Sequence, residues 1–184
     1  MSYLPCELHC HTIHSDGDFT VSELQKAAVD DHLAIIALTD HNTFSGWDEL
    51  DDNIIPAIRG IEWTTYFGHM LVLGANDFVD WRDAQPDNID EKIKQVKAVG
   101  GIVGIAHPYQ LGSPLCTGGR WEFNVRDWRN VDYIEVWHQN LYSAKRENER
   151  ALELWTSLLD KGYKIAATYG RDWHREETSG HYGC

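Results

Sequence analysis

Residues 57–74 have the sequence AIRGIEWTTYFGHMLVLG, in which two short apolar runs follow each other closely. Only six residues lie between Glu62 in the first run and His69 at the start of the second. Two parallel strands need a crossover of about a dozen residues between them. The spacing therefore predicts that residues 57–63 and 69–74 pair as an antiparallel hairpin.

Outside this hairpin, apolar runs rich in β-branched residues alternate with helical patterns. The further strand-like runs are 34–39, 101–107, 132–137 and 164–170. Helical spacing of apolar residues occurs in 21–28, 89–99 and 144–159, and Thr20 with Glu23 forms a capping box before the first of these. Strand and helix in alternation predict an α/β fold with a largely parallel sheet or barrel, distorted by the one hairpin.

Histidine and carboxylate residues gather where these strands are expected to end. In α/β sheets and barrels, functional groups lie at the carboxyl ends of the strands. His69 begins its run, but a strand returning from a hairpin starts where its partner finished, so we expect His69 beside Glu62. The nine residues at this end are His9, His11, Asp16, His41, Glu62, His69, His107, Asp172 and His174.

This set of side chains is typical of a metal site. His9 and His11 are two residues apart, so both rings would point to one side of an extended strand. Imidazoles and carboxylates without cysteine suit Zn, Mn or Fe, and a shared carboxylate can bridge two ions. Nine ligands exceed the needs of one ion, so we expect two or three divalent metal ions.

Six motifs in order resemble those of the polymerase-and-histidinol-phosphatase (PHP) family of metallohydrolases. They are HCHTIHSDG (9–17), LTDHN (38–42), GIEWTT (60–65), GHMLVLG (68–74), IAHP (105–108) and GRDWH (170–174). The resemblance implies a distorted (β/α)7 barrel with a trinuclear site. It also implies which residues share each ion: His9, His11 and Asp172 for the first, Glu62 bridging to the second, His69 and His107 for the second, and Asp16, His41 and His174 for the third.

Within the family, residues 60–74 and the DWR at 80–82 look most like the carbaryl-hydrolase (CehA/McbA) branch. That similarity implies carboxylic or carbamate esters as substrates. The general expectation for the family is a phosphoesterase, in which a hydroxide held between two metals attacks phosphorus. A third alternative is an inactive metal-binding regulatory module. All nine ligand positions hold ligand-type residues, which disfavours this alternative.

Four further residues are candidates for a role in the site. His138 follows a strand on the metal face. It acts either in the reaction, as a general acid or a substrate contact, or it is simply an exposed loop histidine, and the same two interpretations apply to Glu135. Arg171, next to Asp172, is placed to hold an anionic substrate through paired hydrogen bonds. Asp40 is expected to orient a ligand imidazole rather than to bind metal.

Composition restricts the class of protein and of partner. The net charge of −13 disfavours binding to nucleic acid, and no apolar run approaches the length that spans a bilayer. Without a secretory signal or paired CxxC cysteines, we expect a cytoplasmic enzyme with a small-molecule substrate, a phosphate ester. The 184 residues suit a single domain, 1–184, which is either compact or truncated at its C-terminus.

Overall fold

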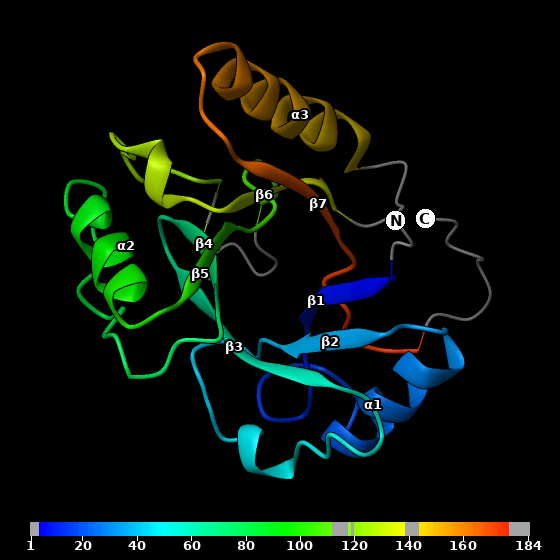
Figure 1. Ribbon diagram of the computed structural model, residues 1–184. Coiled ribbons are helices and arrows are strands. Elements are labelled where there is room, and N and C mark those ends of the chain that lie inside the picture. The colour runs from blue at the N-terminus through cyan, green and yellow to red at the C-terminus, as the bar shows by residue number, and fades with distance from the viewer. Residues whose placement is uncertain (1–3, 112–117, 119, 139–143, 177–184) are drawn as a thin grey trace.

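The computed structural model describes residues 4–111, 118, 120–138 and 144–176, and its seven strands form one sheet that nearly closes into a barrel (Figure 1). The strands follow one another around the sheet in chain order. They are β1 (Cys6–Cys10), β2 (Ile35–Leu38), β3 (Ala57–Thr65), β4 (Gly68–Leu73), β5 (Ile102–Ile105), β6 (Tyr133–His138) and β7 (Ala166–Gly170). The predicted α/β barrel is confirmed.

The predicted hairpin is formed by β3 and β4, which pair antiparallel with Thr64 opposite His69 and Thr65 opposite Gly68. Gly68 has a φ of 125°, a backbone conformation that residues other than glycine rarely adopt. β4 also runs antiparallel to β5, whereas the other neighbouring strands are parallel. The barrel therefore contains one reversed strand, at the position that the short connection predicts.

The barrel closes between β1 and the segment that follows β7. The His11 amide donates to the Trp173 carbonyl at 2.9 Å, and the Trp173 amide donates to the His9 carbonyl at 2.9 Å. Asp172, which lies just before this contact, has a φ of 52°, in the left-handed region. The closure brings the far end of the chain against the histidines of β1.

In the part of the chain that the structure describes, three α-helices lie outside the barrel: α1 (Val21–Asp30) against β2, α2 (Ile89–Ala98) against β5 and α3 (Lys145–Asp160) against β6 (Figure 1). The capping box predicted for α1 is present, with Thr20 and Glu23 each bonding the other's backbone. Among the described residues, the connections contain the short 3-10 helices η1 (Trp47–Glu49) and η3 (Trp128–Asn130). None of the described helices has the length and apolar character needed to cross a bilayer.

The apolar core has an inner and an outer layer. The outer layer packs the helices on the barrel, with residues such as Leu24 and Ile93 fully buried. The inner layer includes Leu71, Leu73 and Tyr133. Gly104 is required here, because a Cβ at this position would lie 2.1 Å from the Tyr133 ring. Apolar side chains fill this inner layer of the barrel. The buried histidines and carboxylates lie beyond it, at the ends of the strands.

Candidate metal centre

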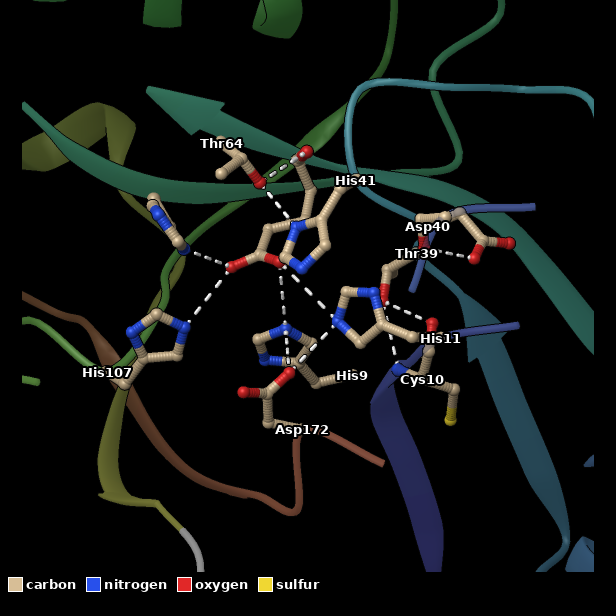
Figure 2. A network of polar contacts seen from close by, with 12 residues as sticks. His9, Cys10, His11, Thr39, Asp40, His41, Thr64, His107 and Asp172 are labelled. Carbon is tan, nitrogen blue, oxygen red and sulfur yellow. Dashed lines mark hydrogen bonds and ion pairs between the residues drawn. The ribbon is translucent and has the colours of Figure 1, made fainter. Parts of the chain in front are cut away.

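All nine residues predicted as ligands meet in one cluster at the carboxyl ends of the strands. Figure 2 shows five of them, His9, His11, His41, His107 and Asp172, around one centre. His9 belongs to β1 and His11 follows it, Glu62 and His69 come from the two strands of the hairpin, and His107 follows β5. Among the described residues, suitable ligand atoms fall into four overlapping groups. Three of them correspond to the three ions that the sequence resemblance implies, and the fourth joins His9 and His107 to Glu135.

The first group joins His9, His11, Glu62 and Asp172. Oδ1 of Asp172 lies 3.2 Å from Nε2 of His9 and 3.0 Å from Nε2 of His11, and Oε2 of Glu62 lies 3.3 Å from Nε2 of His9. These four atoms are buried, and none of them has a hydrogen-bond partner within the described part of the chain. Buried polar atoms are nearly always hydrogen-bonded, so four unsatisfied ligand atoms facing one point fit a bound cation.

The second group joins the other oxygen of Glu62 to two more imidazoles. Oε1 of Glu62 lies 2.9 Å from Nδ1 of His69 and 3.2 Å from Nε2 of His107. His107 has a φ of 24°, an uncommon conformation for a residue other than glycine. Because the two oxygens of Glu62 face different groups, this carboxylate is oriented to bridge two cations.

The third group lies nearer the surface and contains Asp16, His41 and His174, with His11 also within reach. Oδ1 of Asp16 lies 3.1 Å from Nε2 of His174 and 3.4 Å from Nε2 of His41. His41 also links this group to the bridging carboxylate, because its Nδ1 lies 2.7 Å from Oε2 of Glu62.

The carboxylates of the cluster are held in their charged form. Burial alone would raise the pKa of Glu62, but the surrounding imidazoles, His9 and His69 foremost, hold that pKa well below its usual range. Burial would lower the pKa of His41, but the neighbouring carboxylates of Asp16 and Glu62 outweigh this effect and raise that pKa to about 10. Imidazoles that hold protons here would release them on binding a cation, since metal ligands must be deprotonated.

Glu135, whose role the sequence left open, contacts two of the predicted ligands. Its buried carboxylate accepts from Nδ1 of His9 at 2.9 Å and from the backbone amide of His107 at 3.0 Å. A bond at Nδ1 fixes the tautomer of His9 and leaves Nε2 for the first group. Gly170 makes room for this carboxylate, because a Cβ there would lie 2.1 Å from Oε1 of Glu135.

Asp40 does not contact an imidazole through its carboxylate in the described structure, contrary to the prediction that it orients one. It accepts instead from the amide and hydroxyl of Thr12, both at 2.7 Å, and from the hydroxyl of Ser15 at 2.6 Å. These bonds shape the turn between His11 and Asp16. The carboxylate of Asp40 therefore acts on the cluster through the loop that carries Asp16.

The contacts of Arg171 do not support the prediction that it holds an anionic substrate. Its guanidinium lies 3.2 Å from a carboxylate oxygen of Glu7, 2.7 Å from one of Asp31 and 3.6 Å above the ring of Trp173. Glu7 is buried, which raises its pKa from 4.5 to about 7, and it accepts from the backbone amide of His9 at 3.1 Å. Arg171 therefore acts on the first group indirectly, because it contacts Glu7, which accepts a hydrogen bond from the backbone of His9.

His138 is not an exposed loop histidine, because it ends β6 and is 2% exposed. Its Nε2 lies 3.8 Å from Oδ2 of Asp172, and its ring centroid lies 4.7 Å from that of His107. Asn148 of α3 bonds both backbone groups of His138 and fixes its position. Burial, with a smaller effect of His107, lowers the pKa of His138 to about 4, so the imidazole is neutral at pH 7.

Comparison with known protein structures shows similarity to chains with the same fold. One is a two-domain protein from Bacteroides vulgatus that contains a predicted PHP-like metal-dependent phosphoesterase, with a TM-score of 0.68 and 22% identity over 94% of this chain and 52% of that one. Another is a proposed metal-dependent phosphoesterase from Bifidobacterium adolescentis, with a TM-score of 0.63 and 20% identity over 94% and 88% of the two chains. An amidohydrolase from Chromobacterium violaceum with bound sulfate and no metal has a TM-score of 0.60 and 18% identity over 92% and 87%.

Sequence comparison gives relatives in Methanocaldococcus jannaschii. The uncharacterised protein MJ1295 is 30% identical over 110 residues, which are 59% of this chain and 48% of the relative. The uncharacterised protein MJ1587 is 29% identical over 153 residues, 74% of this chain and 85% of the relative. The chain thus spans about half the length of MJ1295 and of the Bacteroides vulgatus protein. The model of the PHP domain matches residues 7–103, more than half of the sequence, and the chain therefore belongs to the PHP domain family.

Proposed function

We propose that the chain is a metal-dependent hydrolase that cleaves phosphate esters. The observation that carries this proposal is the group of four buried ligand atoms, on His9, His11, Glu62 and Asp172, that face one another without hydrogen-bond partners in the described structure. Desolvating such atoms is costly unless something binds them, and a divalent cation satisfies both imidazole nitrogens and carboxylate oxygens.

The proposed ligand sets follow the three groups. His9, His11 and Asp172 would hold the first cation, His69 and His107 the second, with Glu62 between them, and Asp16, His41 and His174 the third. Zn, Mn and Fe all accept these donors, and two or three ions would be held. Bound cations would supply hydroxide at neutral pH and offset the charge on the phosphate oxygens.

The remaining residues of the site position these ligands and handle the leaving group. Glu135 holds Nδ1 of His9, so that Nε2 points into the cluster. His138, neutral at pH 7 and fixed by Asn148, would donate a hydrogen bond to the leaving oxygen from beside Asp172. Burial of His9, His11 and Glu62 keeps bulk water from competing for these atoms.

Hydrolysis of carboxylic or carbamate esters by the same cluster is the alternative. It is supported by the resemblance of residues 60–74 and 80–82 to the carbaryl-hydrolase branch. The phosphate-ester proposal is supported by two structural neighbours that are described as metal-dependent phosphoesterases, one predicted and one proposed. An inactive regulatory module fits less well, because the three groups are complete.

Parallel assays test the proposal. An aryl phosphate, an aryl acetate and an aryl N-methylcarbamate are incubated with protein loaded with Zn, Mn or Fe and with chelated protein. We expect the phosphate to be the fastest substrate and its turnover to stop on chelation. Faster carbamate or acetate turnover would favour the alternative, and turnover that survives complete chelation would contradict the proposal.

A matched pair of variants ties the activity to the cluster. Glu62→Gln removes the buried carboxylate, whereas Glu49→Gln makes the same change at an exposed residue whose described partner is His14. Hydrolysis is expected to be lost in the first variant and kept in the second. Activity that persists in Glu62→Gln would come from another site or a contaminant.

A further inference from the structure

The outer face of β3 is covered by loops and not by an α-helix. The helices α1, α2 and α3 contact β2, β5 and β6, while the link from β2 to β3 contains only the short η1, and the hairpin turn after β3 contains no helix. Residues 44–47 and 75–79 lie over this face instead. They leave a pocket of about 310 Å³.

The walls of this pocket are rich in aromatic rings. Phe44, Trp47, Trp63 and Phe78 line it, and the ring centroid of Phe44 lies 4.6 Å from that of Trp47 and 5.8 Å from that of Phe78. Flat rings gain most by edge-to-face and offset contacts with other rings. Small-molecule sites begin at about 300 Å³ and are mostly apolar with a few polar groups, so the pocket has the size and the lining of a site for one small aromatic molecule.

Two opposite charges line the same pocket without pairing. Arg59 and Asp77 are both exposed, and within the part of the chain that the structure describes Arg59 forms no ion pair or side-chain hydrogen bond, with Asp77 or with another residue. Oδ1 of Asp77 accepts from the amide of its neighbour Phe78 at 2.8 Å, and its other oxygen has no described partner. A guanidinium and a carboxylate at one pocket suit a ligand that carries a carboxylate and an ammonium.

The pocket is separate from the candidate metal centre. Ile61 and Trp63 line it, and these residues flank Glu62 in β3. Successive side chains of a strand point to opposite faces, so Glu62 points into the barrel while its neighbours point to the pocket. The β3 strand therefore stands between the two sites.

We propose that this pocket binds a free aromatic amino acid. Its ring lies among Phe44, Trp47, Trp63 and Phe78, its carboxylate faces Arg59 and its ammonium faces Asp77. This inference goes beyond the proposed hydrolysis and does not depend on it, because none of the nine predicted metal ligands lines the pocket.

Titration calorimetry with L-phenylalanine tests the proposal, together with the fluorescence of Trp47 and Trp63. Three analogues each lack one feature: 3-phenylpropionate the ammonium, phenethylamine the carboxylate and L-alanine the ring. Partly exposed ion pairs contribute up to about 1 kcal/mol, which corresponds to about fivefold in affinity. We expect each analogue to bind about fivefold more weakly than L-phenylalanine, or weaker still. No binding of L-phenylalanine, or equal binding of all four compounds, would overturn the proposal.

Variants at the pocket assign each contact. Arg59→Gln is expected to weaken L-phenylalanine and 3-phenylpropionate about fivefold and to leave phenethylamine unchanged, whereas Asp77→Asn is expected to do the reverse. Arg146→Gln, at an exposed arginine of α3, is the matched control and is expected to change nothing. Phe78 is 51% exposed, so Phe78→Ala removes a wall at little cost to folding and is expected to weaken all ring-bearing ligands.

The two proposed sites can fail independently. Binding of L-phenylalanine is expected to be the same in chelated protein and in Glu62→Gln as in the metal-loaded protein. Unchanged binding in both Arg59→Gln and Asp77→Asn would show that the ligand lies elsewhere, and the inference would then be wrong whatever the hydrolysis assays give.

Discussion

Nδ1 of His69 lies 2.9 Å from Oε1 of Glu62, although the two residues belong to strands that run in opposite directions. The contact follows from the register of the hairpin, in which Thr64 pairs with His69. Glu62 lies two residues before Thr64, so the side chains of Glu62 and His69 share a face of the sheet. A parallel crossover would have placed His69 at the opposite end of the barrel. The reversal of β4 thus adds an imidazole to the candidate metal centre.

Glu62→Gln should remove the bridge between the first and second groups. The amide keeps one acceptor oxygen and loses the negative charge that faces both groups, so metal affinity is expected to fall by more than about 100-fold. Metal content after gentle purification measures the effect, with Glu49→Gln as the control. A Glu62→Gln protein with full metal content and full activity would show that Glu62 is not a ligand.

Glu135→Gln should weaken metal binding while the nine proposed ligands stay in place. Its amide can accept from only one of the two donors, Nδ1 of His9 and the amide of His107, that the carboxylate now serves. Loss of such an orienting group costs about 10- to 100-fold in affinity. Competition with a chelator of known affinity measures this loss. Equal affinity in the variant and the parent protein would mean that Glu135 is only structural.

Gly170→Ala should reproduce the Glu135→Gln effect without touching a polar group. The added Cβ would lie 2.1 Å from Oε1 of Glu135 and force that carboxylate away from His9. Combining the two changes should cost less than the sum of their separate effects on metal affinity, because both act on one contact. Additive losses would show that Gly170 acts by another route.

His138→Ala should separate catalysis from metal binding. General acid-base or hydrogen-bonding groups at the leaving oxygen contribute about 100-fold or more to turnover. We therefore expect kcat to fall about 100-fold with an unchanged metal content. Loss of metal in this variant would make His138 a ligand, and unchanged kcat would exclude it from the reaction.

Glu7→Gln should change how stability depends on pH in the chelated protein. The pKa of Glu7 is raised from 4.5 to about 7, so its stabilising effect is complete below pH 4.5 and is lost as the pH rises through 7. The variant lacks this loss, so its stability relative to the parent should increase from pH 5 to pH 8, by up to about 3 kcal/mol. Urea unfolding at both pH values measures the difference, and parallel pH profiles would contradict it.

Much of the architecture could be predicted from local features of the sequence. The connection between Glu62 and His69 is too short for a crossover and so predicts the hairpin, and Thr20 with Glu23 predicts the start of α1. The convergence of the nine predicted ligands also follows, because in such a barrel the carboxyl ends of the strands meet at one rim.

The residues behind the ligands could not be assigned in this way. Glu135 meets His9 across 126 positions of sequence, and Arg171 meets Asp31 across 140. Such pairs depend on the closure of the barrel between β1 and the segment after β7. They also depend on the irregular pairing of β6 with β7 near Glu135. Glu7 carries a weak signal, because it lies two residues before His9 in β1 and shares its face.

Elemental analysis of gently purified protein, with phosphate-ester hydrolysis measured before and after chelation, tests the central claim most directly. The account predicts about two or three equivalents of divalent metal per chain and hydrolysis that stops on chelation and returns on adding the metal back. A folded protein that contains no metal and hydrolyses its substrate at full rate would contradict it.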